Sequence, residues 1–132
     1  MINLRYIFIL IFIVFAINTF SQVSDNFDYN DFTENPEWIG DTSQFKINSS
    51  NQLQLNSSVA DTSYLSTANT LINDIKWEFW VKQSFNSSAN NHSRVYLVSD
   101  KVNLEDSLNG YYIQIGGSND SLGFFKQTGN IH

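Results

Sequence analysis

Hydrophobic and polar residues alternate with a period of two over most of the chain after residue 25. The clearest stretch is residues 74–85. Its apolar side chains share one face, namely Ile75, Trp77, Phe79 and Val81. The other face holds Lys76, Glu78, Trp80 and Lys82. A shift of one residue would bury two lysines and a glutamate, so the pattern predicts a strand with a well-defined register.

Further strands are predicted at residues 44–48, 52–56, 94–99, 111–115 and 122–127. The first two of these alternate, whereas 94–99 is apolar on both faces, as expected of a central strand. Turns are expected at 49–51, 109–110, 116–120 and 128–130, where Asn, Gly and Ser gather. No stretch after residue 22 has a helical period. The pattern therefore predicts an all-β, antiparallel, two-sheet sandwich. Its expected core is Ile75, Trp77, Phe79, Val81, Val95, Leu97, Ile113 and Ile115.

The first 21 residues predict a secretory signal peptide. Arg5 is the only charged residue before an apolar run over residues 6–17, and the small residues Thr19 and Ser21 follow it. The run is shorter than the about 20 residues of a spanning helix. We therefore expect a signal-peptide helix at 1–21 and a mature domain at 22–132 that is secreted or on the cell surface, without membrane attachment after cleavage. An uncleaved N-terminal anchor is the alternative.

Composition narrows the possible partners. The chain has 13 acidic and seven basic residues, a net charge of −6, and loss of Arg5 with the signal would make it more acidic. A negative field repels phosphate backbones, so nucleic acid is not expected as a partner. No cysteine is present. A disulfide and a lipid-modified cysteine are therefore excluded, and the domain must be stabilised by its packing.

The last residues, Ile131 and His132, look like the start of another strand. An apolar strand edge without a partner invites aggregation. We therefore expect the chain to be the N-terminal part of a longer domain.

Several segments together resemble the concanavalin A-like, laminin-G-like jelly roll at the start of exported Bacteroidetes proteins. They are residues 25–27, 35–41, Phe45, 53–56, 77–81, 94–100 and 108–116. The resemblance spans nearly the whole mature chain and implies a jelly-roll sandwich that is incomplete at its C-terminus. These motifs are structural, and fold analogy does not assign a function.

Catalytic patterns are missing. Jelly-roll glycosidases place two carboxylates across the scissile bond, commonly from a Glu-x-Asp-x-x-Glu strand. Glu78 lies on the best strand, but the two later positions of that pattern are Trp80 and Gln83. The sequence predicts no enzyme within these residues. A hydrolase domain beyond residue 132, which this domain would assist, remains an alternative.

Carbohydrate binding or cell-surface adhesion is the function that the residues favour. Lectin-like sandwiches stack a sugar on an exposed aromatic ring and bind its hydroxyls with polar side chains. Trp80, Tyr112, Gln114 and Glu78 are the predicted ligand-binding residues, if their strands are neighbours. The alternative is a spacer domain without a ligand, in which Trp80 is packed.

Calcium is a further possible ligand. Asp25 and Asp28 lie in an oxygen-rich N-terminal segment, and Asp41 follows the loop at Trp38. Calcium takes six to eight hard oxygen ligands, so these three aspartates are the predicted metal site. The EF-hand spacing is absent, and solvated acidic loops are the alternative interpretation.

Overall fold

The computed structural model describes residues 23–34, 36–71 and 73–131. The predicted signal peptide lies outside these residues. In chain order the elements are β1 (Ile39–Gly40), η1 (Thr42–Gln44), β2 (Phe45–Ile47), β3 (Leu53–Leu55), β4 (Leu65–Ser66), β5 (His92–Ser99), β6 (Leu108–Gly116) and β7 (Ser121–Gly129). Apart from the short 3-10 helix η1, all these elements are strands. The described chain is therefore mostly β, as the alternation predicts.

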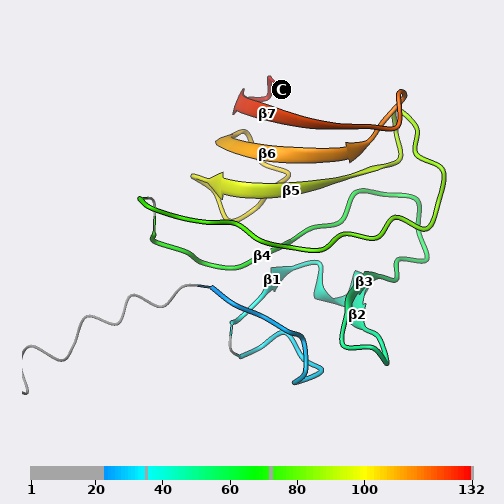
Figure 1. Cartoon of the computed structure of the whole chain (residues 1–132), viewed down its shortest axis with the longest axis vertical. Coiled ribbons are helices and arrows are strands. Elements are labelled where there is room, and N and C mark those ends of the chain that lie inside the picture. Colours follow the sequence, from blue (N-terminus) through cyan, green and yellow to red (C-terminus); the bar gives the residue numbers. More distant parts are fainter. Residues whose placement is uncertain (1–22, 35, 72, 132) are drawn as a thin grey trace, which may run out of the picture.

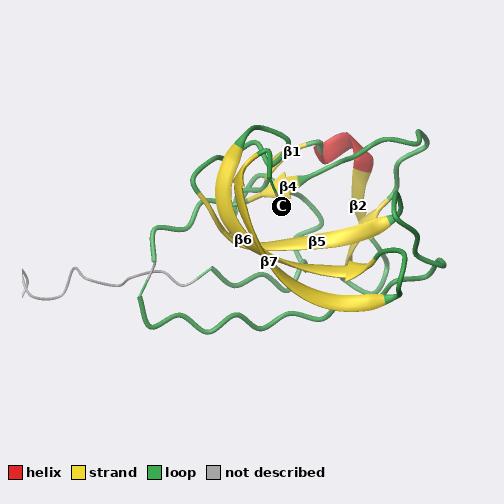
Figure 2. Cartoon of the chain, turned by 90° about the horizontal axis from the view of Figure 1, so that it is seen from above, coloured by secondary structure: helices red, strands yellow, loops and turns green. Residues whose placement is uncertain are grey.

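The strands form three small antiparallel sheets (Figure 1). They pair as β1–β4, β2–β3 and β5–β6–β7. The third is the largest and curves strongly in Figure 2. Within the described residues the three sheets are separate and no closed jelly-roll sandwich is present, so two facing sheets remain a prediction.

The hairpin prediction at 44–56 is confirmed. Phe45 pairs with Leu55 and Ile47 with Leu53. Asn51 adopts a positive φ of 55° between the strands, a conformation that asparagine tolerates well. The side-chain oxygen of Asn48 accepts hydrogen bonds from the backbone N–H groups of Ser50 and Gln52. The Asn48 backbone also donates to the Gln52 carbonyl and accepts from the Asn51 N–H, which closes the turn. Turn chemistry therefore determines this element locally.

Antiparallel pairing of β6 with β7 is also confirmed, with a turn over residues 117–120. The predicted turn at Asn109-Gly110 is wrong, because both residues lie inside β6. A Cβ at position 110 would lie 2.5 Å from the carbonyl oxygen of Val98 on β5. Glycine is needed here for close strand approach beside an irregularity between Tyr96 and Val98.

Residues 74–85 do not form the predicted strand, since they join no ladder in the described structure. Figure 1 shows the segment crossing the molecule in an extended path, and Figure 2 draws it as loop. Alternation sets which side chains share a face, but a strand also requires a partner for its backbone hydrogen bonds. The prediction of a strand at residues 74–85 is therefore wrong.

Burial centres on the β5–β6–β7 sheet, on the face opposite to the predicted one. Tyr112 and Leu108 are 1% and 0% exposed, and Gln127 is buried with them. The predicted core residues Trp77, Phe79 and Val81 are 40%, 39% and 45% exposed, so this part of the prediction is wrong. The other five are only half-buried: Ile75, Val95, Leu97, Ile113 and Ile115.

A row of aromatic rings explains the burial of Tyr112. Tyr96, Tyr112 and Phe125 are paired across the three strands. Ring centroids lie 5.0 Å apart between Tyr96 and Tyr112, and 5.3 Å apart between Tyr112 and Phe125. The Arg94 guanidinium carbon lies 4.9 Å from the Tyr112 centroid. Aromatic and cation–π contacts of this kind stabilise the face on which they lie.

Gln127 is the polar component of this packing. Its side-chain oxygen accepts a hydrogen bond from the Tyr96 hydroxyl at 2.5 Å, and its amide nitrogen donates to the Gly129 carbonyl at 2.9 Å. Burial raises the pKa of the Tyr96 phenol above its ordinary value. The hydroxyl therefore stays protonated as the donor at neutral pH.

Candidate ligand-binding surface

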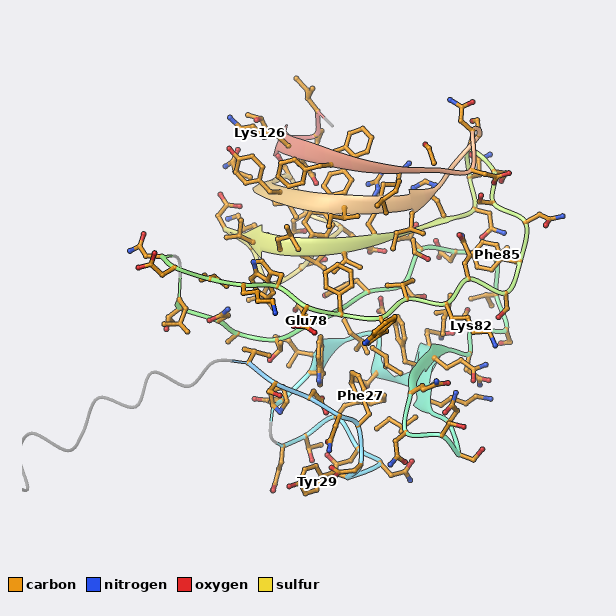
Figure 3. The ribbon with its side chains drawn as sticks, viewed as in Figure 1. Phe27, Tyr29, Glu78, Lys82, Phe85 and Lys126 are labelled. Atoms are coloured by element: carbon orange, nitrogen blue, oxygen red, sulfur yellow. The ribbon has the colours of Figure 1, made fainter. Side chains whose placement is uncertain are left out.

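Trp80 is 98% exposed, and its neighbours in the extended segment are charged. In an extended chain, residues two apart lie on the same face, so alternation places Trp80 on one face with Glu78 and Lys82. Figure 3 labels both of these residues along the segment. We call Lys76, Glu78, Trp80 and Lys82 together the Trp80 strip.

One ion pair lies within the strip. The Lys76 ammonium nitrogen is 2.6 Å from a carboxylate oxygen of Glu78, with both side chains well exposed. Lys82 has no ion-pair partner within the part of the chain that the structure describes. The strip therefore presents an indole ring between a neutralised pair and a single positive charge.

The predicted platform requires Tyr112 to be exposed, and this is wrong. Tyr112 is 1% exposed and lies between Tyr96 and Phe125. Because the side chain is 1% exposed, with Tyr96, Phe125 and the Arg94 guanidinium around its ring, it cannot offer a face to a sugar. Sequence alternation alone does not show which face of β6 is buried.

Gln114 also belongs to this packed face. It is half-buried, and its side-chain oxygen accepts a hydrogen bond from the Arg94 Nε at 3.2 Å. Arg94 in turn covers the Tyr112 ring. Gln114 thus helps to position the Arg94 guanidinium over Tyr112, and it lies beside the packed aromatic row.

The predicted calcium ligands make hydrogen bonds with their own surroundings. Asp25 accepts from the Phe27 backbone N–H and the Trp38 indole N–H, each at 2.7 Å. Asp41 accepts from the Tyr64 backbone N–H at 3.0 Å. Asp28 accepts from the side-chain amide of Asn26 at 3.0 Å. These contacts organise the N-terminal loops.

Residues 23–34, 36–71 and 73–131 contain no group of three or more His, Cys, Asp or Glu side chains arranged to hold a metal ion. The structure therefore does not bring Asp25, Asp28 and Asp41 together as a ligand set. Calcium binding stays a prediction without geometric support.

A second acidic loop joins β5 to β6. Asp100 accepts hydrogen bonds from the backbone N–H and side-chain amide of Asn109 at 2.7 and 2.8 Å. Its pKa is lowered, chiefly by the backbone hydrogen bond from Asn109, because hydrogen bonds to the charged form favour it. Asp100 therefore closes the hairpin.

An open pocket of about 330 Å³ lies beside the β6–β7 turn, and the alternation pattern does not predict it. Phe85, Ile115 and Leu122 supply its apolar lining, while Gln83, Asn86, Ser87, Asp120 and Ser121 supply polar groups. The Ser87 hydroxyl donates to the Asp120 carboxylate. A Cβ at Gly116 would lie 2.6 Å from that of Ser87. Gly116 is the sequence signal for this close approach.

Comparisons with protein-family models, with curated proteins and with solved structures gave no match. In the described ranges no helix has the length and apolar character needed to span a membrane. Functional inference for this chain therefore depends on its own residues.

Proposed function

We propose that the mature chain is a non-catalytic extracellular module that binds carbohydrate. The observation that carries this proposal is the 98% exposure of Trp80. An indole ring loses apolar contact with water when a sugar ring covers it. Contiguous exposed apolar patches rimmed by polar residues are typical of interaction sites, and Trp77, Phe79 and Val81 of the same segment are also 40%, 39% and 45% exposed.

The strip suits a sugar ligand in its chemistry. The flat indole would stack on the C–H face of a pyranose, while the Lys76 and Glu78 side chains offer a donor and an acceptor to the hydroxyls. One such stacking contact contributes about 1 kcal/mol beyond area burial, by analogy with aromatic pairs. Millimolar affinity, about 4 kcal/mol in total, is expected for a site of this size.

Replacement of the indole tests the proposal. Trp80→Ala should abolish glycan-array binding by the secreted chain and leave its β-type circular-dichroism spectrum unchanged. Tyr29→Ala is the matched control, because Tyr29 is also an exposed aromatic residue, at 63%, and Figure 3 places it away from Glu78 and Lys82.

Two results would count against the proposal. Equal array signals for the wild type and Trp80→Ala would show that the indole is not used. Absence of binding to every glycan in the wild type would favour a spacer domain instead.

A further inference from the structure

The charges of the Trp80 strip are arranged unevenly about the indole. On one side the ammonium of Lys76 is neutralised by Glu78 at 2.6 Å. On the other side Lys82 is exposed and has no ion-pair partner among the described residues. The strip therefore has one uncompensated charge, and it is positive.

Lys82 is within reach of a ligand on the indole. Residues two apart on an extended chain project from the same face and lie about 7 Å from each other. A lysine side chain is long and flexible, with an ammonium group that donates three hydrogen bonds. An anionic group on the edge of a sugar stacked on Trp80 would therefore meet the Lys82 ammonium.

From this arrangement we propose that the Trp80 strip selects acidic sugars, specifically hexuronic acids whose ring carboxylate pairs with Lys82. The inference rests on the proposed function, since it requires a sugar on Trp80. Glu78 does not oppose the carboxylate, because its own charge is paired with Lys76. The orientation follows: hydroxyls face the Lys76–Glu78 pair, and the carboxylate faces Lys82.

The full chain has a net charge of −6, and the mature chain without Arg5 would be more acidic, but this charge acts against the preference mainly at long range. At physiological ionic strength the screening length is about 8 Å, so the contact between carboxylate and ammonium dominates. Because the pair is exposed, its effect is small. We expect a preference of about twofold to fivefold, which corresponds to a typical exposed ion pair.

A pair of probes that differ only in charge tests the inference. Oligogalacturonide and its methyl ester have the same rings, and the ester removes the negative charge. In buffered physiological salt the wild type should bind the acid about twofold to fivefold more tightly than the ester. Lys82→Gln should abolish this difference, and Lys82→Arg should retain it.

Lys126→Gln is the matched control. It changes the net charge by the same amount, and Lys126 is exposed on β7, away from Glu78 and Lys82 in Figure 3. This variant should keep the wild-type preference. An equal loss of preference in Lys126→Gln and Lys82→Gln would show a bulk charge effect and overturn the inference.

Failure of this inference is distinguishable from failure of the proposed function. Equal affinity for acid and ester, together with loss of both in Trp80→Ala, would leave carbohydrate binding in place and refute acid selection. If neither probe nor any neutral glycan binds, the proposed function fails as well.

Discussion

Tyr112 and Trp80 are both aromatic residues in alternating stretches, yet their side chains are 1% and 98% exposed. Tyr112 lies on the middle strand β6, where β5 and β7 each place an aromatic ring beside it. Trp80 lies in a segment without ladder partners. Tyr112 is buried because Tyr96 and Phe125 lie at its own register position and Arg94 covers its ring, whereas residues 74–85 have no ladder partner that could place side chains beside Trp80 in this way.

The comparison therefore separates two roles for aromatic residues. The row at Tyr96, Tyr112 and Phe125 packs on the sheet, whereas Trp80 is 98% exposed and contributes little to packing. Substitutions in the row should change stability, and those in the strip should change binding. Four measurements test this distinction.

The largest effect is expected from Tyr112→Ala. Removing a buried aromatic side chain costs about 3–5 kcal/mol of unfolding free energy, through lost burial and the cavity left behind. Urea denaturation of the variant and of the wild type measures the difference. Tyr29→Ala, at a 63% exposed position, should change the value little. A loss below about 1 kcal/mol for Tyr112→Ala, within the usual range of mild substitutions, would contradict the role of the row.

Tyr96→Phe should have the next largest effect. The substitution removes the hydroxyl that donates to Gln127, and Gln127 is 3% exposed. Leaving a buried acceptor without a donor costs about 1–3 kcal/mol. The same denaturation experiment measures it. The double variant Tyr96→Phe, Gln127→Leu should recover part of the loss, because the unpaired acceptor is then absent. If the losses of the single variants simply add, the hydrogen bond is not coupled as described.

Acid should weaken the β5–β6 hairpin through Asp100. The pKa of this carboxyl is lowered in the folded state. Its contribution to the free energy of unfolding is therefore fully present above the pKa of the unfolded chain, about 3.9, and is lost as the pH falls through the lower pKa of the folded state. Unfolding midpoints measured from pH 6 downward should therefore decrease below about pH 4. Asp100→Asn should flatten this decrease. An identical pH profile in that variant would assign the acid sensitivity to other carboxyls.

The smallest change in stability is expected from Trp80→Ala. Substitution of an exposed side chain away from special features usually changes the unfolding free energy by less than about 0.5 kcal/mol. Thermal and urea unfolding of this variant should match the wild type within that range. A larger loss would mean that Trp80 packs in solution, and the binding surface proposed for it would then not exist.

Sequence alone determined the elements whose signals are local. The apolar run at 94–99 and the turn signals around 111–115 and 122–127 predicted the strands β5, β6 and β7, and the polar turn at 49–51 predicted the β2–β3 hairpin. These predictions succeeded because side-chain period and turn conformation depend on a few adjacent residues. The four predicted ligand-binding residues do not stay together in the structure. Trp80 and Glu78 lie together in the Trp80 strip, while Tyr112 and Gln114 belong to the packed row.

Which face of each alternating stretch is buried depends on the packing of the folded chain. Tyr111 and Tyr112 are adjacent and chemically identical, yet they are 41% and 1% exposed. The difference arises because Tyr96 and Phe125 stand in register with Tyr112, and Arg94 covers its ring. The exposure of Trp80 likewise follows from residues 74–85 lacking a ladder partner. Burial depends on side chains brought from distant parts of the chain, so a local pattern does not contain it.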